Sequence, residues 1–260
     1  MLPHISDKIR QISSFFIHSS TPIALSMDAL RLKRTGFVAV SRDGLKLAIR
    51  PSVGESFTFY ENLVRRDYLG GEIALKPGDT VVDIGANIGT FSILAASVAG
   101  PSGRVIACEP VPETFERLKA NVALNGLDNV ECRCQAVDAA DGILELMVSR
   151  KSALSTAHMG NRDGVDQVSL AIPCVSLETL MAESRIDRIH LLKVDCEGSE
   201  YGIFQSLSPE IADRIDQIAM EIHPVPGRGP ADLKANLEAL GFDVECGYTW
   251  FAYNRKRRTA

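Results

Sequence analysis

The chain has 260 residues, of which 45% are hydrophobic and 23% are charged, as in globular proteins that bury a substantial core. Its net charge of −5 disfavours a nucleic-acid partner, and no apolar run approaches the ~20 residues of a membrane span. The N-terminus lacks the layout of a secretory signal, and the six cysteines lack zinc spacing, so we expect a cytoplasmic protein with reduced cysteines.

The first 75 residues are expected to form a cap that precedes the main domain. Residues 1 to about 35 have the spacing of amphipathic helices, with a break at Thr21-Pro22. Residues 37–50 alternate apolar and polar side chains around a turn, which predicts a β-hairpin, and residues 55–75 predict one or two short helices. The apolar first helix would also allow a homo-oligomer.

Residues 76–254 alternate between strand and helix patterns, which predicts a mostly parallel sheet with right-handed crossovers. The last two strands are expected to pair antiparallel at one edge, and residues 255–260 to form a solvated basic tail. The fold class is therefore α/β, with a seven-stranded sheet that carries an antiparallel edge pair. We expect strands at 81–84, 104–108, 130–137, 189–194, 216–222, 242–246 and 249–253, with helices at 88–99, 112–125, 176–183, 199–207 and 230–240.

Residues 141–175 interrupt this alternation. Two further strands are expected at 143–148 and 168–175, on either side of a polar stretch from Lys151 to Gly164. The pair is predicted to form a hairpin or an extension of the sheet, at a place where a loop could contact a substrate.

A glycine-rich turn follows the first strand of the sheet, with Gly85, Asn87 and Gly89 at its bends. A strand, a tight turn and a helix N-terminus together present backbone amides that suit an anionic or polar ligand tail. Glu109 ends the next strand, where a carboxylate can accept hydrogen bonds from both ribose hydroxyls. The pair predicts a cofactor that contains a nucleoside.

Two features of this turn distinguish between cofactors. Asn87 occupies the place of the second glycine of the dinucleotide pattern, and Asp83 adds a negative charge just before the turn. This charge is unfavourable for a pyrophosphate, whereas it suits the ammonium group of a cofactor with an amino-acid tail. The turn therefore favours S-adenosylmethionine over a dinucleotide.

Four segments together resemble the FkbM-type methyltransferases, which are class I (Rossmann-like), S-adenosylmethionine-dependent enzymes that mostly methylate hydroxyl groups of sugars and natural products. The resemblance spans about residues 40 to 250. It implies that Asp83 and the turn with Gly85, Asn87 and Gly89 hold the methionine part, that Glu109 binds the ribose and that Asp138 lies near the adenine. The segments are Asp83–Gly89, Glu109-Pro110, Leu192–Glu200 and Glu221–Pro224.

Asp195, Glu197 and His223 are the candidate catalytic residues. Asp195 ends an apolar strand, so its carboxylate is expected at the edge of the sheet where cofactor and acceptor meet. Either Asp195 or His223 could remove the proton of an acceptor hydroxyl, whereas Glu197 and Glu200 could equally cap a helix end. A divalent cation is an alternative way to activate the hydroxyl, and we expect none. Lys193 is expected to form an internal ion pair.

The sequence thus predicts an O-methyltransferase for a small hydroxylated acceptor, such as a sugar or a secondary metabolite. One alternative is a nucleotide-dependent oxidoreductase, and another is a scaffold that binds the cofactor without turnover. The segment after residues 189–194 lacks the Asn/Asp-Pro-Pro-aromatic motif of enzymes that methylate amino groups of DNA bases or glutamine.

Overall fold

A seven-stranded sheet in the order β12-β13-β11-β10-β3-β4-β5 forms the centre of the computed structural model, which describes residues 5–149, 155–156 and 167–257. Neighbouring strands pair in parallel, except that β13 runs antiparallel to both β11 and β12. The predicted mostly parallel sheet with an antiparallel edge pair is confirmed. The strands are β3 (Thr80–Ile84), β4 (Arg104–Cys108), β5 (Val130–Arg133), β10 (Leu191–Val194), β11 (Gln217–Met220), β12 (Phe242–Glu245) and β13 (Trp250–Asn254).

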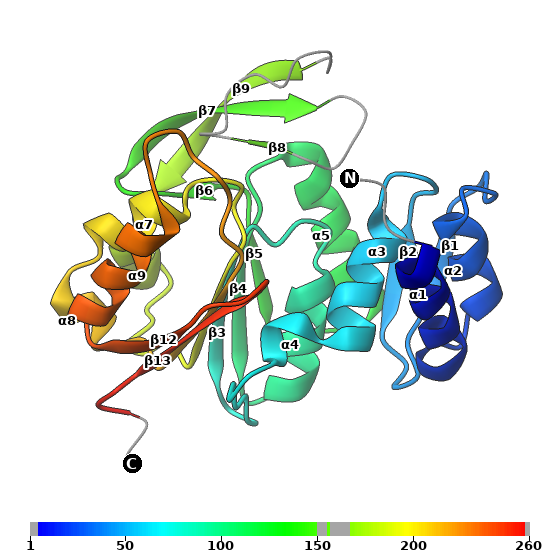
Figure 1. The fold of residues 1–260 in the computed structure, drawn as a ribbon, viewed down its shortest axis with the longest axis horizontal. Coiled ribbons are helices and arrows are strands. Elements are labelled where there is room, and N and C mark those ends of the chain that lie inside the picture. Colours follow the sequence, from blue (N-terminus) through cyan, green and yellow to red (C-terminus); the bar gives the residue numbers. More distant parts are fainter. Residues whose placement is uncertain (1–4, 150–154, 157–166, 258–260) are drawn as a thin grey trace.

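Helices cover both faces of this sheet (Figure 1). On one face, α6 to α9 bury their apolar side chains in a common cluster with the sheet. On the other face, α4 lies between the sheet and the N-terminal cap, so almost all of its side chains are buried. These helices are α4 (Thr90–Ala99), α5 (Pro112–Leu124), α6 (Leu177–Glu183), α7 (Glu200–Ser206), α8 (Pro209–Ala212) and α9 (Pro230–Ala239).

The cap consists of helices and the predicted hairpin, in which Phe37 pairs with Ile49. It shares a hydrophobic cluster with the main domain, because Phe15 and Leu47 lie in the same cluster as Ile88 and Leu118. The cap therefore packs directly onto the helices beside the sheet, while its boundary at residue 75 stays a prediction. Its elements are α1 (Ile5–His18), α2 (Pro22–Ala29), β1 (Phe37–Val40), β2 (Lys46–Ile49), α3 (Glu55–Phe59), the π-helix η1 (Tyr60–Arg65) and the 3₁₀-helix η2 (Asp67–Leu69).

A second sheet, in the order β6-β9-β7-β8, contains the interruption at residues 141–175. The predicted hairpin is confirmed, since β7 and β9 pair antiparallel. The single strand expected at 130–137 is wrong, because its last two residues leave the main sheet and pair with β9. The polar stretch from Lys151 to Gly164 lies outside the described residues, apart from β8. The strands are β6 (Ala136–Val137), β7 (Gly142–Ser149), β8 (Ser155–Thr156) and β9 (Gln167–Val175).

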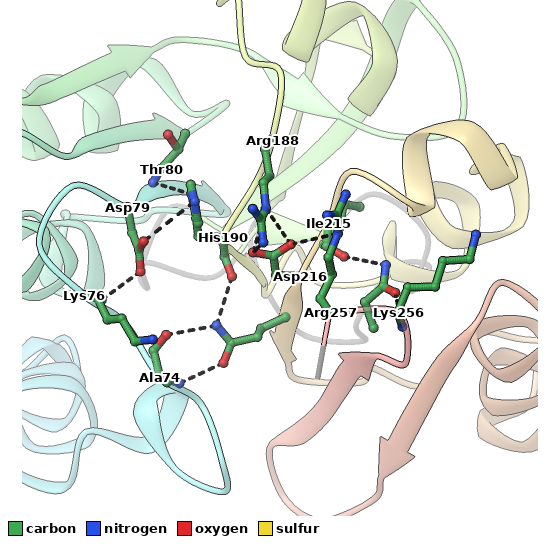
Figure 2. Close-up of polar contacts among 12 residues, drawn as sticks. Ala74, Lys76, Asp79, Thr80, Arg188, His190, Ile215, Asp216, Lys256 and Arg257 are labelled. Carbon is green, nitrogen blue, oxygen red and sulfur yellow. Dashed lines mark hydrogen bonds and ion pairs between the residues drawn. The ribbon is translucent and has the colours of Figure 1, made fainter. Parts of the chain in front are cut away.

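Polar side chains tie together the amino ends of β3, β10 and β11 (Figure 2). His190 Nδ1 accepts the Thr80 amide at 2.9 Å, and its other ring nitrogen lies 3.7 Å from Asp79. Asp216 pairs with Arg188 at 2.8 Å and lies 3.8 Å from Arg257. Polar groups at this edge thus bind one another, and Arg257, part of the expected basic tail, is held against the domain.

No helix in the described part of the chain is long and apolar enough to cross a membrane. The cytoplasmic location stays a prediction.

Candidate functional site

The glycine turn between β3 and α4 is held against the end of β10. Gly85 has a φ of +76°, and a Cβ atom there would lie 1.9 Å from the carbonyl oxygen of Asp195. Asn87 and Gly89 also have positive φ, at 51° and 88°. Only glycine fits at position 85, because the backbone conformation and the close approach both exclude a side chain. This contact places Asp195 beside the turn.

The amides of this turn bind protein atoms. The N–H groups of Gly85 and Ala86 both donate to the carbonyl oxygen of Cys108, at 3.0 and 2.9 Å. The N–H group of Asn87 donates to Glu109, and that of Gly89 donates to Ala86. Since these four donors are already used, the expectation that the turn offers an amide surface to an anion is wrong for them. A pyrophosphate would find few free donors here, which disfavours a dinucleotide.

Asp83 lies below the turn and is fully buried. Its carboxylate accepts a hydrogen bond from Ser92 at 2.5 Å and pairs with Lys193 Nζ at 3.1 Å. Burial disfavours the charge of Lys193, but Asp83 and Asp195 outweigh this and raise its pKa. Lys193 also donates to the carbonyl oxygen of Gly85 at 2.8 Å. The expected internal ion pair is therefore present, and it supports the turn from below.

A cavity opens above the turn, at the carboxyl ends of β3, β4 and β10. Strand β7 of the second sheet contributes Leu144 and Leu146 to its wall. Within the described residues, two buried polar atoms of the lining have no hydrogen-bond partner, namely Asn87 Oδ1 and Gln135 Nε2. Buried polar groups are nearly always satisfied, so an unpaired acceptor and an unpaired donor fit a polar ligand that supplies both. Sequence reasoning missed Gln135, which no motif marks.

Glu109 faces this cavity from the end of β4 and is 5% exposed. Its two carboxylate oxygens accept the N–H groups of Asn87 and Val111, each at 2.9 Å. Burial raises the pKa of Glu109 to about 7, although these two hydrogen bonds oppose the increase. The bonds fix the carboxylate at the cavity wall, where the oxygens keep lone pairs for two hydroxyl donors.

Asp138 does not line this cavity. Its carboxylate accepts the hydroxyl of Ser199 at 3.0 Å and the N–H group of Ala139 at 2.7 Å. Asp138 thus connects the end of β6 to the start of α7, and Ser199 is the member of this pair that lines the cavity. Its expected place beside the adenine stays a prediction.

Asp195 and Glu221 meet at the carboxyl ends of β10 and β11, together with a tyrosine from the cap. The hydroxyl of Tyr68 lies 2.9 Å from Asp195 Oδ2 and 2.8 Å from Glu221 Oε1. Burial and the two carboxylates raise the pKa of Tyr68 well above its ordinary value, so the hydroxyl keeps its hydrogen. The single hydroxyl hydrogen of Tyr68 is therefore shared between the carboxylates of Asp195 and Glu221. Burial and the charge of Asp195 also raise the pKa of Glu221.

His223 lies among three carboxylates. Its Nδ1 is 2.8 Å from Glu200, and its Nε2 is 3.8 Å from Asp195 and 4.0 Å from Glu197. Burial would lower the pKa of His223, but the hydrogen bond to Glu200 and the negative charges raise it to about 9. The ring is consequently a cation at neutral pH.

Glu200 and Glu197 differ in their roles. Glu200 is fully buried and accepts the N–H groups of Cys196 and Gly198, at 3.2 and 2.9 Å, so it holds the loop that precedes α7, and its expected capping of the helix stays a prediction. Glu197 has a φ of 55° and lines the cavity beside Asp195. The structure thus brings all three candidate catalytic residues, Asp195, Glu197 and His223, into one cluster.

Sequence reasoning did not assign roles to Tyr68 and Glu221. Glu221 lies two residues before His223, so the alternation of side chains along a strand could have placed both on one face. Tyr68 lies 127 residues before Asp195 in a single turn of 3₁₀-helix, and its local sequence carries no signal.

Comparisons with known proteins identify a family through a family pattern and through a curated relative. The family pattern described as "Methyltransferase FkbM domain" matches residues 83–249. A "31-O-demethyl-FK506 methyltransferase FkbM" from Streptomyces tacrolimicus is 30% identical over 74% of this chain and 84% of its own. A "Hexuronic acid methyltransferase AglP" from Haloferax volcanii is 26% identical over 64% of each chain. Among solved structures, a "Methyltransferase FkbM" from Methylobacillus flagellatus is 14% identical, with a TM-score of 0.45, over 95% of this chain and 60% of its own.

Proposed function

Because the chain belongs to the FkbM methyltransferase family and uses S-adenosylmethionine, we propose that it methylates a hydroxyl oxygen of a small acceptor, such as a sugar or a secondary metabolite. The observation that carries this proposal is the position of Asp195. Asp195 lines the cavity above the glycine turn, and its carboxylate belongs to the cluster with Tyr68, Glu221 and His223. The printed names of two relatives, which mention a 31-O position and a hexuronic acid, support an oxygen acceptor.

The residues around the cavity fit the cofactor. Glu109 would accept the two ribose hydroxyls, and the unpaired atoms of Asn87 and Gln135 would bind its polar groups. S-adenosylmethionine, when bound, supplies a methyl group on a positively charged sulfur. Asp83 would act through Lys193 and the turn, because its carboxylate is buried below them.

Asp195 is the proposed general base. The proton of an acceptor hydroxyl would pass to its carboxylate as the methyl–oxygen bond forms and the methyl–sulfur bond breaks, with the electron pair of the broken bond left on the sulfur. Tyr68 holds one oxygen of Asp195, and Lys193 lies 3.8 Å from the same oxygen. The other oxygen faces Nε2 of His223 at 3.8 Å. These neighbours fix the orientation of the carboxylate, and alignment is the other main contribution to an in-line displacement.

His223 is expected to orient Asp195 as a cation rather than to act as the base. We predict that the turnover rate shows no increase with a pKa near 6.5 and falls about tenfold between pH 8 and pH 10, as His223 loses its proton near pH 9. Turnover at saturating S-adenosylmethionine, measured from pH 6 to pH 10, checks this. In His223→Gln, which is neutral throughout, the decrease above pH 8 should disappear. An increase in rate centred near pH 6.5 would identify a neutral histidine base instead.

The same cluster raises the question of a metal ion. Among the described residues, Asp195, Glu221 and His223 offer ligand atoms that lie within 4.8 Å of one another. We expect no metal, because the Nε2 atom of His223 carries a hydrogen at neutral pH and a metal would have to displace it. Prolonged treatment with EDTA should therefore change the turnover rate by less than about twofold. Loss of activity that Mg²⁺ or Mn²⁺ restores would contradict this prediction.

Binding measurements separate the proposal from its two alternatives. We expect S-adenosylhomocysteine to bind in a calorimetric titration and NAD to show no binding, since the amides of the turn are used within the protein. Tighter binding of NAD would favour an oxidoreductase. Binding of S-adenosylhomocysteine without methyl transfer to any of a panel of hydroxylated extracts would favour a scaffold. Homo-oligomerisation and the absence of a nucleic-acid partner stay predictions.

A further inference from the structure

A groove of about 420 Å³ lies between α1, the segment formed by α3 and η1, and Tyr248 in the turn between β12 and β13. It is distinct from the cavity above the glycine turn, because the two share no lining residue. Part of its wall is the π-helix η1, a rare conformation that is frequent at functional sites. The segment that follows η1 carries Tyr68 to the catalytic carboxylates.

Gln11 supplies an unpaired donor to this groove. Its side chain comes from α1 and is only 3% exposed. The Oε1 atom accepts a hydrogen bond from Lys8 at 3.2 Å, whereas Nε2 has no partner within the described residues. A buried donor without an acceptor destabilises the folded protein. A ligand oxygen in the groove would satisfy it.

Glu61 supplies a second polar group, from η1. Burial, and then the charge of Glu221, raise the pKa of Glu61 to about 8. The side chain is therefore mostly a neutral carboxylic acid at pH 7, which donates one hydrogen bond and accepts others, as a hydroxyl group requires. Glu61 lies seven residues before Tyr68, whose hydroxyl lies 2.9 Å from Asp195 and 2.8 Å from Glu221, so the chain leads from this end of the groove to the catalytic carboxylates.

Aromatic rings form the rest of the wall. Tyr248 is 68% exposed and Phe57 is 43% exposed, and the Phe57 ring lies 6.3 Å from that of Tyr60. Tyr248 lies two residues before Trp250, which pairs with Met220, the residue before Glu221, so Tyr248 lies at the same edge of the sheet as the catalytic cluster. Pockets that combine aromatic faces with a few convergent polar groups are typical binding sites for small molecules. Carbon–hydrogen edges of a saturated ring pack well against such faces.

We propose that this groove binds the methyl acceptor, and that the part of the acceptor held there is a hydroxylated saturated ring. The ring would pack on Tyr248 and Phe57, while its hydroxyls would bind the Nε2 atom of Gln11 and the carboxyl group of Glu61. This inference rests on the proposed function and locates its second substrate.

Saturation-transfer NMR with methyl β-D-glucopyranoside and with myo-inositol tests the proposal. The wild-type protein should bind at least one of these two probes. Tyr248→Ala and Gln11→Leu should each weaken the binding about fivefold or more, since each removes a contact of about 1 kcal/mol. Phe16→Ala is the matched control, because Phe16 is an exposed aromatic residue of α1 that does not line the groove. Thermal melting shows that each variant is folded.

Two outcomes would overturn the proposal: neither probe binds the wild-type protein, or both groove variants bind a probe as tightly as Phe16→Ala does. If one of the two variants does not fold, the other decides. Titration of the same proteins with S-adenosylhomocysteine should give unchanged affinities. If S-adenosylhomocysteine does not bind the wild-type protein, the result would count against the proposed function. The binding of the two probes to the groove would still be measured independently.

Discussion

Asp195→Asn should lower the rate of methyl transfer by about 100-fold or more, the usual contribution of a general base. The amide keeps the shape of the carboxylate and can still accept the hydrogen bond from Tyr68, but it cannot take a proton from the acceptor. The fold should survive, because Asp83 still pairs with Lys193 at 3.1 Å. Transfer of a labelled methyl group to hydroxylated extracts measures the rate.

The control for this variant is Asp243→Asn, which makes the same change at an exposed residue of β12. It should retain the wild-type rate. The affinity for S-adenosylhomocysteine should change by less than about tenfold in Asp195→Asn, since one carboxylate oxygen becomes an amide at the cavity wall. Wild-type turnover in Asp195→Asn would remove Asp195 from the mechanism and point to Glu197 or Glu221 as the base.

Glu109→Ala should weaken the binding of S-adenosylhomocysteine by about 30-fold to 1000-fold, which corresponds to about 2–4 kcal/mol. The variant would remove the two hydrogen bonds that we propose between Glu109 and the ribose hydroxyls. It also leaves the N–H groups of Asn87 and Val111 without their acceptor, so the turn loses its anchor. Isothermal titration calorimetry measures the affinity directly.

Glu113→Ala is the matched control, because Glu113 lies four residues further along the chain and its side chain is 78% exposed. Its affinity should equal that of the wild-type protein. Thermal melting separates lost binding from lost folding, since Glu109→Ala should melt at a lower temperature but still in a single transition. Wild-type affinity in a folded Glu109→Ala would mean that the ribose is bound elsewhere.

The sequence was most informative where chemistry and local geometry coincide. The turn at residues 85–89 needs positive φ at three positions. Its sequence indicates this, because glycine and asparagine tolerate positive φ better than most residues. The place of Asp195 beside β3 followed from an apolar strand that ends in an acid, and β10 does pair with β3. Both inferences depend on contacts close in sequence or on simple sheet geometry.

Other features depend on contacts that no local pattern encodes. Residues 130–137 have continuous strand character, yet the strand divides between two sheets because β9, more than 30 residues later, provides the partner for β6. Tyr68 reaches Asp195 and Glu221 only because it packs in one hydrophobic cluster with residues of β3, β10 and β11. The positive charge of His223 depends on its contact with Glu200, 23 residues earlier in the chain, and the local sequence around His223 does not indicate this contact. At Asp138 the local sequence suggested a contact with the cofactor, whereas in the structure its carboxylate accepts a hydrogen bond from the distant Ser199.

The most direct test of the central claim is to identify the atom that receives the methyl group. The purified protein, incubated with isotopically labelled S-adenosylmethionine and a panel of hydroxylated extracts, should produce a labelled methoxy group detectable by NMR and mass spectrometry. Asp195→Asn should give the same product at a rate lowered about 100-fold or more. A label on nitrogen or carbon, or no labelled product from any extract with a folded protein that binds S-adenosylhomocysteine, would contradict O-methylation.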